Sequence, residues 1–77
     1  MIGFFNGVRK IYIANNLKKL RTDRDLEYKD IMQETGISVS TLKNIEEGLY
    51  KNNNIKTIVA LSVFFKVSVH DFVYTEL

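Results

Sequence analysis

The chemically reactive side chains of this sequence do not form a catalytic set. The chain has no cysteine and a single histidine, His70, whose neighbour Asp71 would not face it on a helix. No nucleophile is accompanied by a base and an orienting group. A zinc site would have to rely almost entirely on carboxylates, so we expect neither a metal nor any other cofactor. We therefore do not expect an enzyme, nor a small-molecule substrate.

A different chemistry is present in the stretch TGISVSTLKNIEEG, residues 35–48. Its apolar residues are spaced to face one way, as on an amphipathic helix. The outward positions then carry a valine, a hydroxyl, an ammonium group and an amide, on Val39, Ser40, Lys43 and Asn44. Compact hydrogen-bonding side chains of this kind are typical of a binding surface, and also of an ordinary solvated helix face.

Length and composition indicate that this helix belongs to a small globular protein. The 77 residues, 45% of them hydrophobic, predict a single domain over 1–77. The net charge is only +2, but residues 1–29 hold seven basic and three acidic side chains, a balance that suits a polyanionic partner or a solvated basic face. No apolar run is long enough for a membrane span and no signal peptide is recognisable, so we expect a cytoplasmic protein.

Hydrophobic spacing predicts five short helices. The first covers roughly 9–24, from the pattern of Ile13, Leu17 and Leu20. The second runs from about 27 to 35 and ends at a glycine, residue 36, in a C-cap position. The third, about 39–47, begins after a serine N-cap at residue 38 and stops at the glycine at 48.

The last two helices follow a loop marked by NNN at 52–54. Asn54 caps a fourth helix whose apolar stripe reaches Phe65. Ser68 caps a fifth, with Asp71 able to reach back in a variant of the capping box. A C-terminal strand is the alternative for this segment, and residues 1–8 could begin the first helix, form a strand or contact a second subunit. The architecture is therefore expected to be all-α.

Two helices joined by a short glycine-containing turn describe a helix-turn-helix, here residues 27–47. Over roughly 13–73 the sequence resembles the phage-repressor and Cro type of regulator, the xenobiotic-response-element family. The resemblance rests on Leu20-Arg21, on Gly36-Ile37-Ser38, on STLKNIEEG at 40–48 and on IKTIVALSVFFKVSVHDFV at 55–73. It implies a compact, five-helix, lambda-repressor-like domain. It also implies a sequence-specific regulator of transcription that binds double-stranded DNA, as a repressor or autoregulator.

The resemblance also assigns roles to individual residues. Val39, Ser40, Lys43 and Asn44 match positions that contact bases in the major groove. Phosphate contacts are expected from Tyr28, Thr41, Lys51, Asn52 and Asn53. The alternative for residues 50–54 is a solvated loop that makes no DNA contact. Arg21 and Glu46 match a partly buried salt bridge between the first and third helices, the alternative being two separately solvated side chains.

Two departures from the family pattern concern the second helix. Glu27-Tyr28 replaces the usual Thr-Gln, so both a good cap and a familiar phosphate ligand are missing. Met32 stands where a small residue normally lets two helices approach. Glu27 and Glu47 would be repelled by phosphates if they faced the duplex. Together with the low net charge, these two residues support an alternative from another class, a protein-interaction module such as an antitoxin or anti-repressor with the same fold.

The resemblance also implies protein partners, and both ends of the chain offer candidate surfaces for them. We expect a homodimer, since family members commonly bind two half-sites, with a regulatory protein as a further partner. The dimer surface is expected in the C-terminal helix and tail, residues 68–77, at Val69, Phe72, Val73, Tyr74 and Leu77. Packing within one chain is the alternative for each of them, and the N-terminal arm at 1–8 offers a second candidate surface in residues 2–5.

Overall fold

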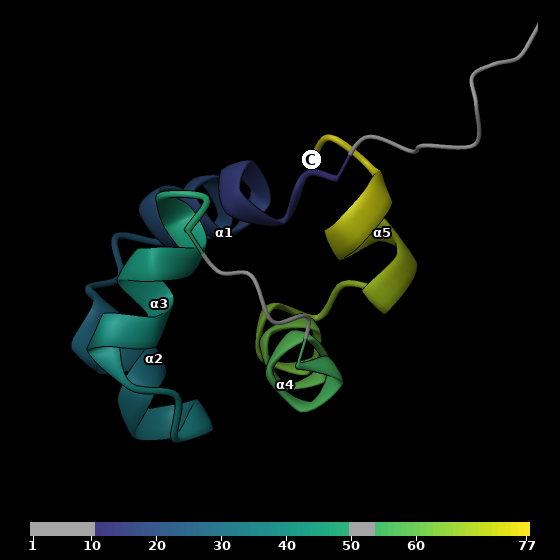
Figure 1. The fold of residues 1–77 in the computed structure, drawn as a ribbon. Coiled ribbons are helices and arrows are strands. Elements are labelled where there is room, and N and C mark those ends of the chain that lie inside the picture. Colours follow the sequence, from purple (N-terminus) through teal and green to yellow (C-terminus); the bar gives the residue numbers. More distant parts are fainter. Residues whose placement is uncertain (1–10, 50–53) are drawn as a thin grey trace, which may run out of the picture.

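The structure is a computed structural model that describes residues 11–49 and 54–77, and the regular structure within these ranges is entirely helical. The helices are α1 (Ile13–Asp23), α2 (Tyr28–Thr35), α3 (Val39–Glu46), α4 (Ile55–Phe65) and α5 (Val69–Tyr74), arranged as in Figure 1. The all-α prediction is confirmed, and the segment considered for a C-terminal strand is α5. The expectations for residues 1–8 and for Lys51, Asn52 and Asn53 lie outside the described residues.

The helices share one hydrophobic core. α1 packs on α3 and α5, α2 packs on α3 and α4, and α4 packs on α5. Every helix contributes at least one buried apolar side chain, and the set is Leu17, Ile31, Leu42, Ile45, Ile58, Leu61, Phe65 and Phe72. Because each helix is short, its stability depends on this packing rather than on its own hydrogen bonds.

The predicted caps are present in the structure. Ser38 and Ser68 accept hydrogen bonds from the third amide of their helices, at 3.1 and 3.0 Å, and Asn54 accepts one from the amide of residue 56. The carboxylate of Asp30 accepts a hydrogen bond from the amide of Glu27 at 2.8 Å, so α2 gains a stabilised start without the family's threonine.

Two local expectations were wrong, and one residue flagged as a departure proves to be exposed. α1 begins at Ile13 rather than near residue 9, because the amide of Tyr12 donates to the carbonyl of Val73 at 2.7 Å and the chain there follows α5. The carboxylate of Asp71 accepts a hydrogen bond from the Thr75 hydroxyl instead of reaching back to its N-cap. Met32 is exposed, so its size does not obstruct a buried helix contact.

A buried amide, not anticipated from the sequence, joins the two ends of the domain. The side chain of Asn16 donates to the carbonyls of Phe72 and Thr75 at 2.8 and 2.7 Å and accepts from the amide of Leu77 at 3.0 Å. Figure 1 shows the C-terminus beside the start of α1. These bonds satisfy backbone groups that α5, with only six residues, leaves unpaired at its end.

Candidate nucleic-acid interface

α2 and α3 form a helix-turn-helix with a three-residue turn at 36–38. Gly36 adopts φ +77, the left-handed conformation that ends α2, and its amide donates to the carbonyl of Met32 at 2.8 Å. Leu42 and Ile45 bury one side of α3 in the core. The turn and these two anchors determine which side of α3 remains outside.

The four residues expected to contact bases all lie on that outer side. Ser40, Lys43 and Asn44 are exposed, and 37% of the surface of Val39 is accessible. All four belong to the first two turns of α3, which follow the Ser38 cap. The structure therefore brings together a valine, a hydroxyl, an ammonium and an amide on one accessible surface.

The far end of α3 is held by the predicted ion pair. Arg21 Nε lies 2.6 Å from Glu46 Oε2, and Arg21 Nη2 donates to Oε1 at 3.1 Å, so the contact is bidentate. The side chains are only 17% and 5% exposed. Arg21 Nη1 also donates to the carbonyl of Leu26, between α1 and α2. The expected partly buried pair therefore has the required geometry.

Tyr28 lies in the same cluster, contrary to the expectation of a phosphate contact. Its hydroxyl donates to Glu46 Oε1 at 3.0 Å, and the Arg21 guanidinium lies 4.4 Å from the centre of its ring. Because a phenol has a single proton, a hydroxyl that donates to a carboxylate cannot also donate to a phosphate oxygen. We call Arg21, Tyr28 and Glu46 the Glu46 cluster.

The electrostatics of the Glu46 cluster are consistent with this geometry. Burial, followed by the hydrogen bond to Glu46, raises the pKa of Tyr28 above its usual value. The hydrogen bond to Glu46 likewise raises the pKa of Arg21. Both shifts favour a neutral phenol and a charged guanidinium at this position.

Of the other residues expected to contact phosphates, Thr41 is the one within the described part of the chain. The hydroxyl of Thr41 accepts from Ser38 Oγ at 2.9 Å, which leaves its own proton available to a phosphate oxygen. Lys56, whose role was not predicted from the sequence, is exposed at the start of α4. It lines a surface groove of about 430 Å³ together with Ser38 and Thr41, which places a cation beside the first turn of α3.

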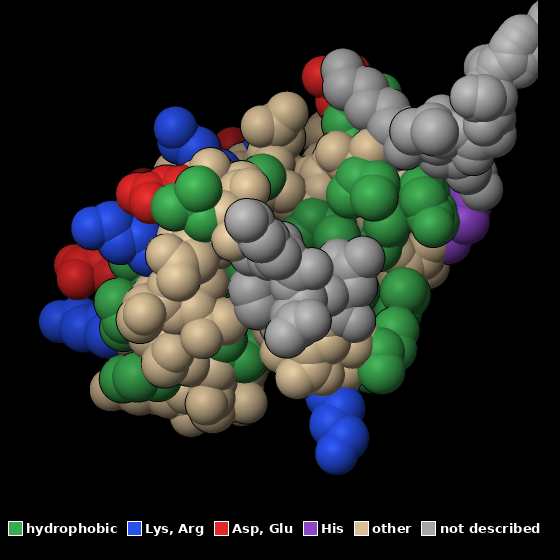
Figure 2. Space-filling view, viewed as in Figure 1, with side chains coloured by type: hydrophobic (Ala, Val, Ile, Leu, Met, Phe, Trp, Pro, Cys, Tyr) green, Lys and Arg blue, Asp and Glu red, His purple; other side chains and the backbone are tan. Residues whose placement is uncertain are grey.

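Some of the basic side chains in and near α1 already have partners within the domain. Lys19 lies 3.3 Å from Asp23, and Arg24 donates to the carbonyl of Phe65 at 3.0 Å, at the end of α4. In Figure 2 basic and acidic side chains alternate along the edge over α1–α3, whereas hydrophobic side chains gather over α5 and beside α4. Of the excess positive charge in residues 1–29, Arg21 is balanced by Glu46, whereas the carbonyl that binds Arg24 carries no net charge.

The residues expected at a dimer surface divide into two groups. Phe72 is completely buried within the chain, so it is not available to a second copy. Tyr74 is 37% exposed, and Val69, Val73 and Leu77 are partly exposed. Three of these line an apolar groove of about 200 Å³, whose walls are Ile11, Ile13, Ile55, Ile58, Val69, Val73 and Tyr74.

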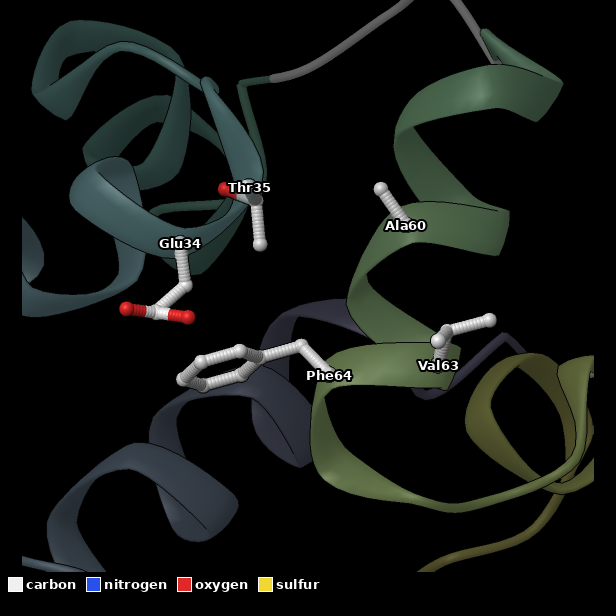
Figure 3. Close-up of a pocket in the computed structure, with 5 residues that line it drawn as sticks. All are labelled: Glu34, Thr35, Ala60, Val63 and Phe64. Carbon is white, nitrogen blue, oxygen red and sulfur yellow. The ribbon is translucent and has the colours of Figure 1, made fainter.

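A larger depression, of about 440 Å³, lies between α2 and α4 (Figure 3). The ring of Phe64 extends from α4 toward Glu34 on α2, whereas Val63 points away from α2. The hydroxyl of Thr35, on its wall, already donates to the carbonyl of Ile31. Small-molecule sites usually combine apolar walls with several convergent polar groups, which this shallow space does not offer.

Comparison with known proteins agrees with this geometry. Residues 16–76 match the model of the Cro/C1-type HTH DNA-binding domain. The chain belongs to this family. Residues 16–76 include all of α2–α5 and the Glu46 cluster, together with the part of α1 that follows residue 15.

Solved structures extend the comparison. The N-terminal DNA-binding domain of SinR from Bacillus subtilis has a TM-score of 0.71 and 26% identity, covering 79% of this chain and 88% of that one. A transcriptional regulator from Listeria innocua is 22% identical with the same TM-score, over 83% and 59% of the two chains. A complex of SinR with SinI has a TM-score of 0.70 and 27% identity, and the match covers 78% of this chain and 58% of that one. No curated protein matches the chain.

Family and fold are those of DNA-binding regulators rather than enzymes, and the chain is a DNA-binding transcriptional regulator of the Cro/C1 type. The expected lambda-repressor-like fold is confirmed. Within residues 11–49 and 54–77, no helix has the length and apolar content that a membrane span requires.

Proposed function

We propose that the chain is a repressor or autoregulator that places α3 in the major groove of double-stranded DNA. The observation that supports this most directly is the arrangement of α3, which is anchored on one side and at its far end while Val39, Ser40, Lys43 and Asn44 stay accessible. A helix used for base recognition needs this combination of a rigid support and a free leading end.

Each outer side chain has a base edge that suits it. Asn44 can pair bidentately with N6 and N7 of adenine, and Lys43 can donate to O6 or N7 of guanine. The methyl groups of Val39 can contact the methyl group of thymine, whereas Ser40 can donate or accept. Thr41 and Lys56, which line the same surface groove, can bind phosphate oxygens beside the first turn of α3. Lys51, Asn52 and Asn53 stay predictions of the same kind.

We further propose a homodimer, formed through Val69, Val73, Tyr74 and Leu77. A dimer would place two copies of α3 on half-sites about one helical turn apart. Sedimentation of the free protein tests this proposal, since we expect a dimer at tens of micromolar. A strict monomer under these conditions would contradict it.

Selection from random duplex DNA tests the DNA-binding proposal. We expect an enriched palindrome. The logarithm of the binding constant for it should fall by about 0.9 per log unit of salt for each phosphate neutralised.

The second candidate function is a protein-interaction module. It is favoured by the exposed Glu27 and Glu47 and by the similarity of the chain to SinR in a complex with SinI. Tight binding to a protein, without enrichment or a salt slope, would support that alternative instead.

A further inference from the structure

Building on the proposed role of α3 in DNA reading, we propose that Tyr28 is a positioning residue for this helix. Its hydroxyl orients α3 through Glu46 and does not contact DNA. The proposal concerns the place where this chain departs from its family's usual glutamine, so the function of that position would have changed from contact to support.

Glu46 is the point at which three helices meet. Its carboxylate accepts hydrogen bonds from Arg21 on α1, twice, and from Tyr28 on α2, while Glu46 itself is the last residue of α3. Only 5% of its side chain is exposed. Hydrogen bonds to a shielded, charged acceptor are stronger than neutral ones, so each donor constrains the carboxylate appreciably.

The position of Tyr28 in α2 explains why its hydroxyl has a mechanical effect. Tyr28 is the first residue of α2 and Glu46 the last of α3, so both lie at the ends remote from the turn at 36–38. The turn joins the two helices at one end, and the Tyr28–Glu46 bond joins them at the other. A helix pair fixed at both ends has less freedom to change its crossing angle than one fixed by the turn alone.

The aromatic ring supports the same arrangement. It packs 4.4 Å from the Arg21 guanidinium, which holds the fork that binds Glu46. Removal of the hydroxyl alone therefore leaves the stacking and the ion pair in place. Tyr28→Phe isolates the bond that links α2 to α3.

The experiment compares the wild type with Tyr28→Phe and with Ser62→Ala as a matched control. Ser62 donates from a buried hydroxyl to Ile58 within α4, so its loss removes a buried hydrogen bond without touching α3. Affinity is measured for the selected operator and for random duplex DNA. We expect Tyr28→Phe to lower the ratio of the two affinities about three- to tenfold, with the salt slope unchanged, and Ser62→Ala to leave the ratio unaltered.

Two results would overturn the proposal. An unchanged ratio in Tyr28→Phe would show that the hydroxyl does not orient α3, and an equal loss of affinity for both DNAs would indicate a phosphate ligand. Hydrogen exchange of the α3 amides in the free protein separates this inference from the function itself. Faster exchange in Tyr28→Phe than in Ser62→Ala would support the positioning role even if the wild type bound no DNA, whereas equal exchange would contradict it.

Discussion

Asn44 and Glu46 stand two residues apart on α3 and face in opposite directions. Positions two apart on a helix are separated by about 200° around its axis, so one side chain can be solvated while the other is enclosed. Asn44 is exposed, whereas Glu46 is enclosed by Arg21 and Tyr28. At the scale of the residue, the proposed base contact and the support of α3 therefore fall to two nearby residues on one helix.

Asn44→Ala should remove a base contact and leave this support intact. We expect a cost of about 1–3 kcal/mol on the operator and a relaxed preference at one base position, as measured by repeating the selection with the variant. Lys56→Ala is the matched comparison, because loss of a phosphate contact should weaken all sequences similarly and reduce the salt slope by about one. Recovery of the wild-type consensus with the Asn44 variant would exclude the assignment.

The role of some polar residues could not be predicted from the sequence. The exposure of Ser40, Lys43 and Asn44 was predictable. Helical spacing alone places them on the side of α3 away from the buried Leu42 and Ile45. Asn16 and Tyr28 were different. The partners that define them lie 56 and 18 residues away in the chain, and no local pattern reveals such contacts.

At the scale of the element, local signals placed most helix ends correctly. The serine and asparagine caps and the glycine at 36 act within three or four residues, so the sequence contains all the information needed. The start of α1 was not predicted, because it depends on the hydrogen bond between Tyr12 and Val73, a residue near the other end of the chain. Boundaries set by tertiary contacts require the fold to be known first.

Gly36 provides a test of the turn. A Cβ at this position would meet no atom within 4 Å, so the backbone conformation, rather than space, is what requires glycine. Gly36→Ala should lower the free energy of unfolding by about 1–2 kcal/mol, measured by chemical denaturation. Gly36→Asn should cost less, since asparagine tolerates the left-handed conformation better. Equal costs for the two variants would argue against this explanation.

At the scale of the whole molecule, Asn16 connects α1 with the C-terminal tail. Asn16→Ala would leave the amide of Leu77 and two carbonyls without their partner, at a cost of about 2–3 kcal/mol. Because the domain is small, each kcal/mol should lower Tm by about 4–8 °C. The neighbouring Asn15 is exposed, so Asn15→Ala is the control and should have little effect. Similar melting temperatures for the two variants would contradict a structural role for Asn16.

The two polar anchors of α1 have a further consequence for the geometry of the operator. Asn16 attaches this helix to α5, where we propose the dimer forms, and Arg21 attaches it to α3. A single helix then connects the subunit contact with the DNA-reading surface, without an intervening hinge. Such a dimer should have a fixed reach, so inserting one base pair between the half-sites, a rotation of about 35° on a repeat of 10–10.5 base pairs, should abolish cooperative binding.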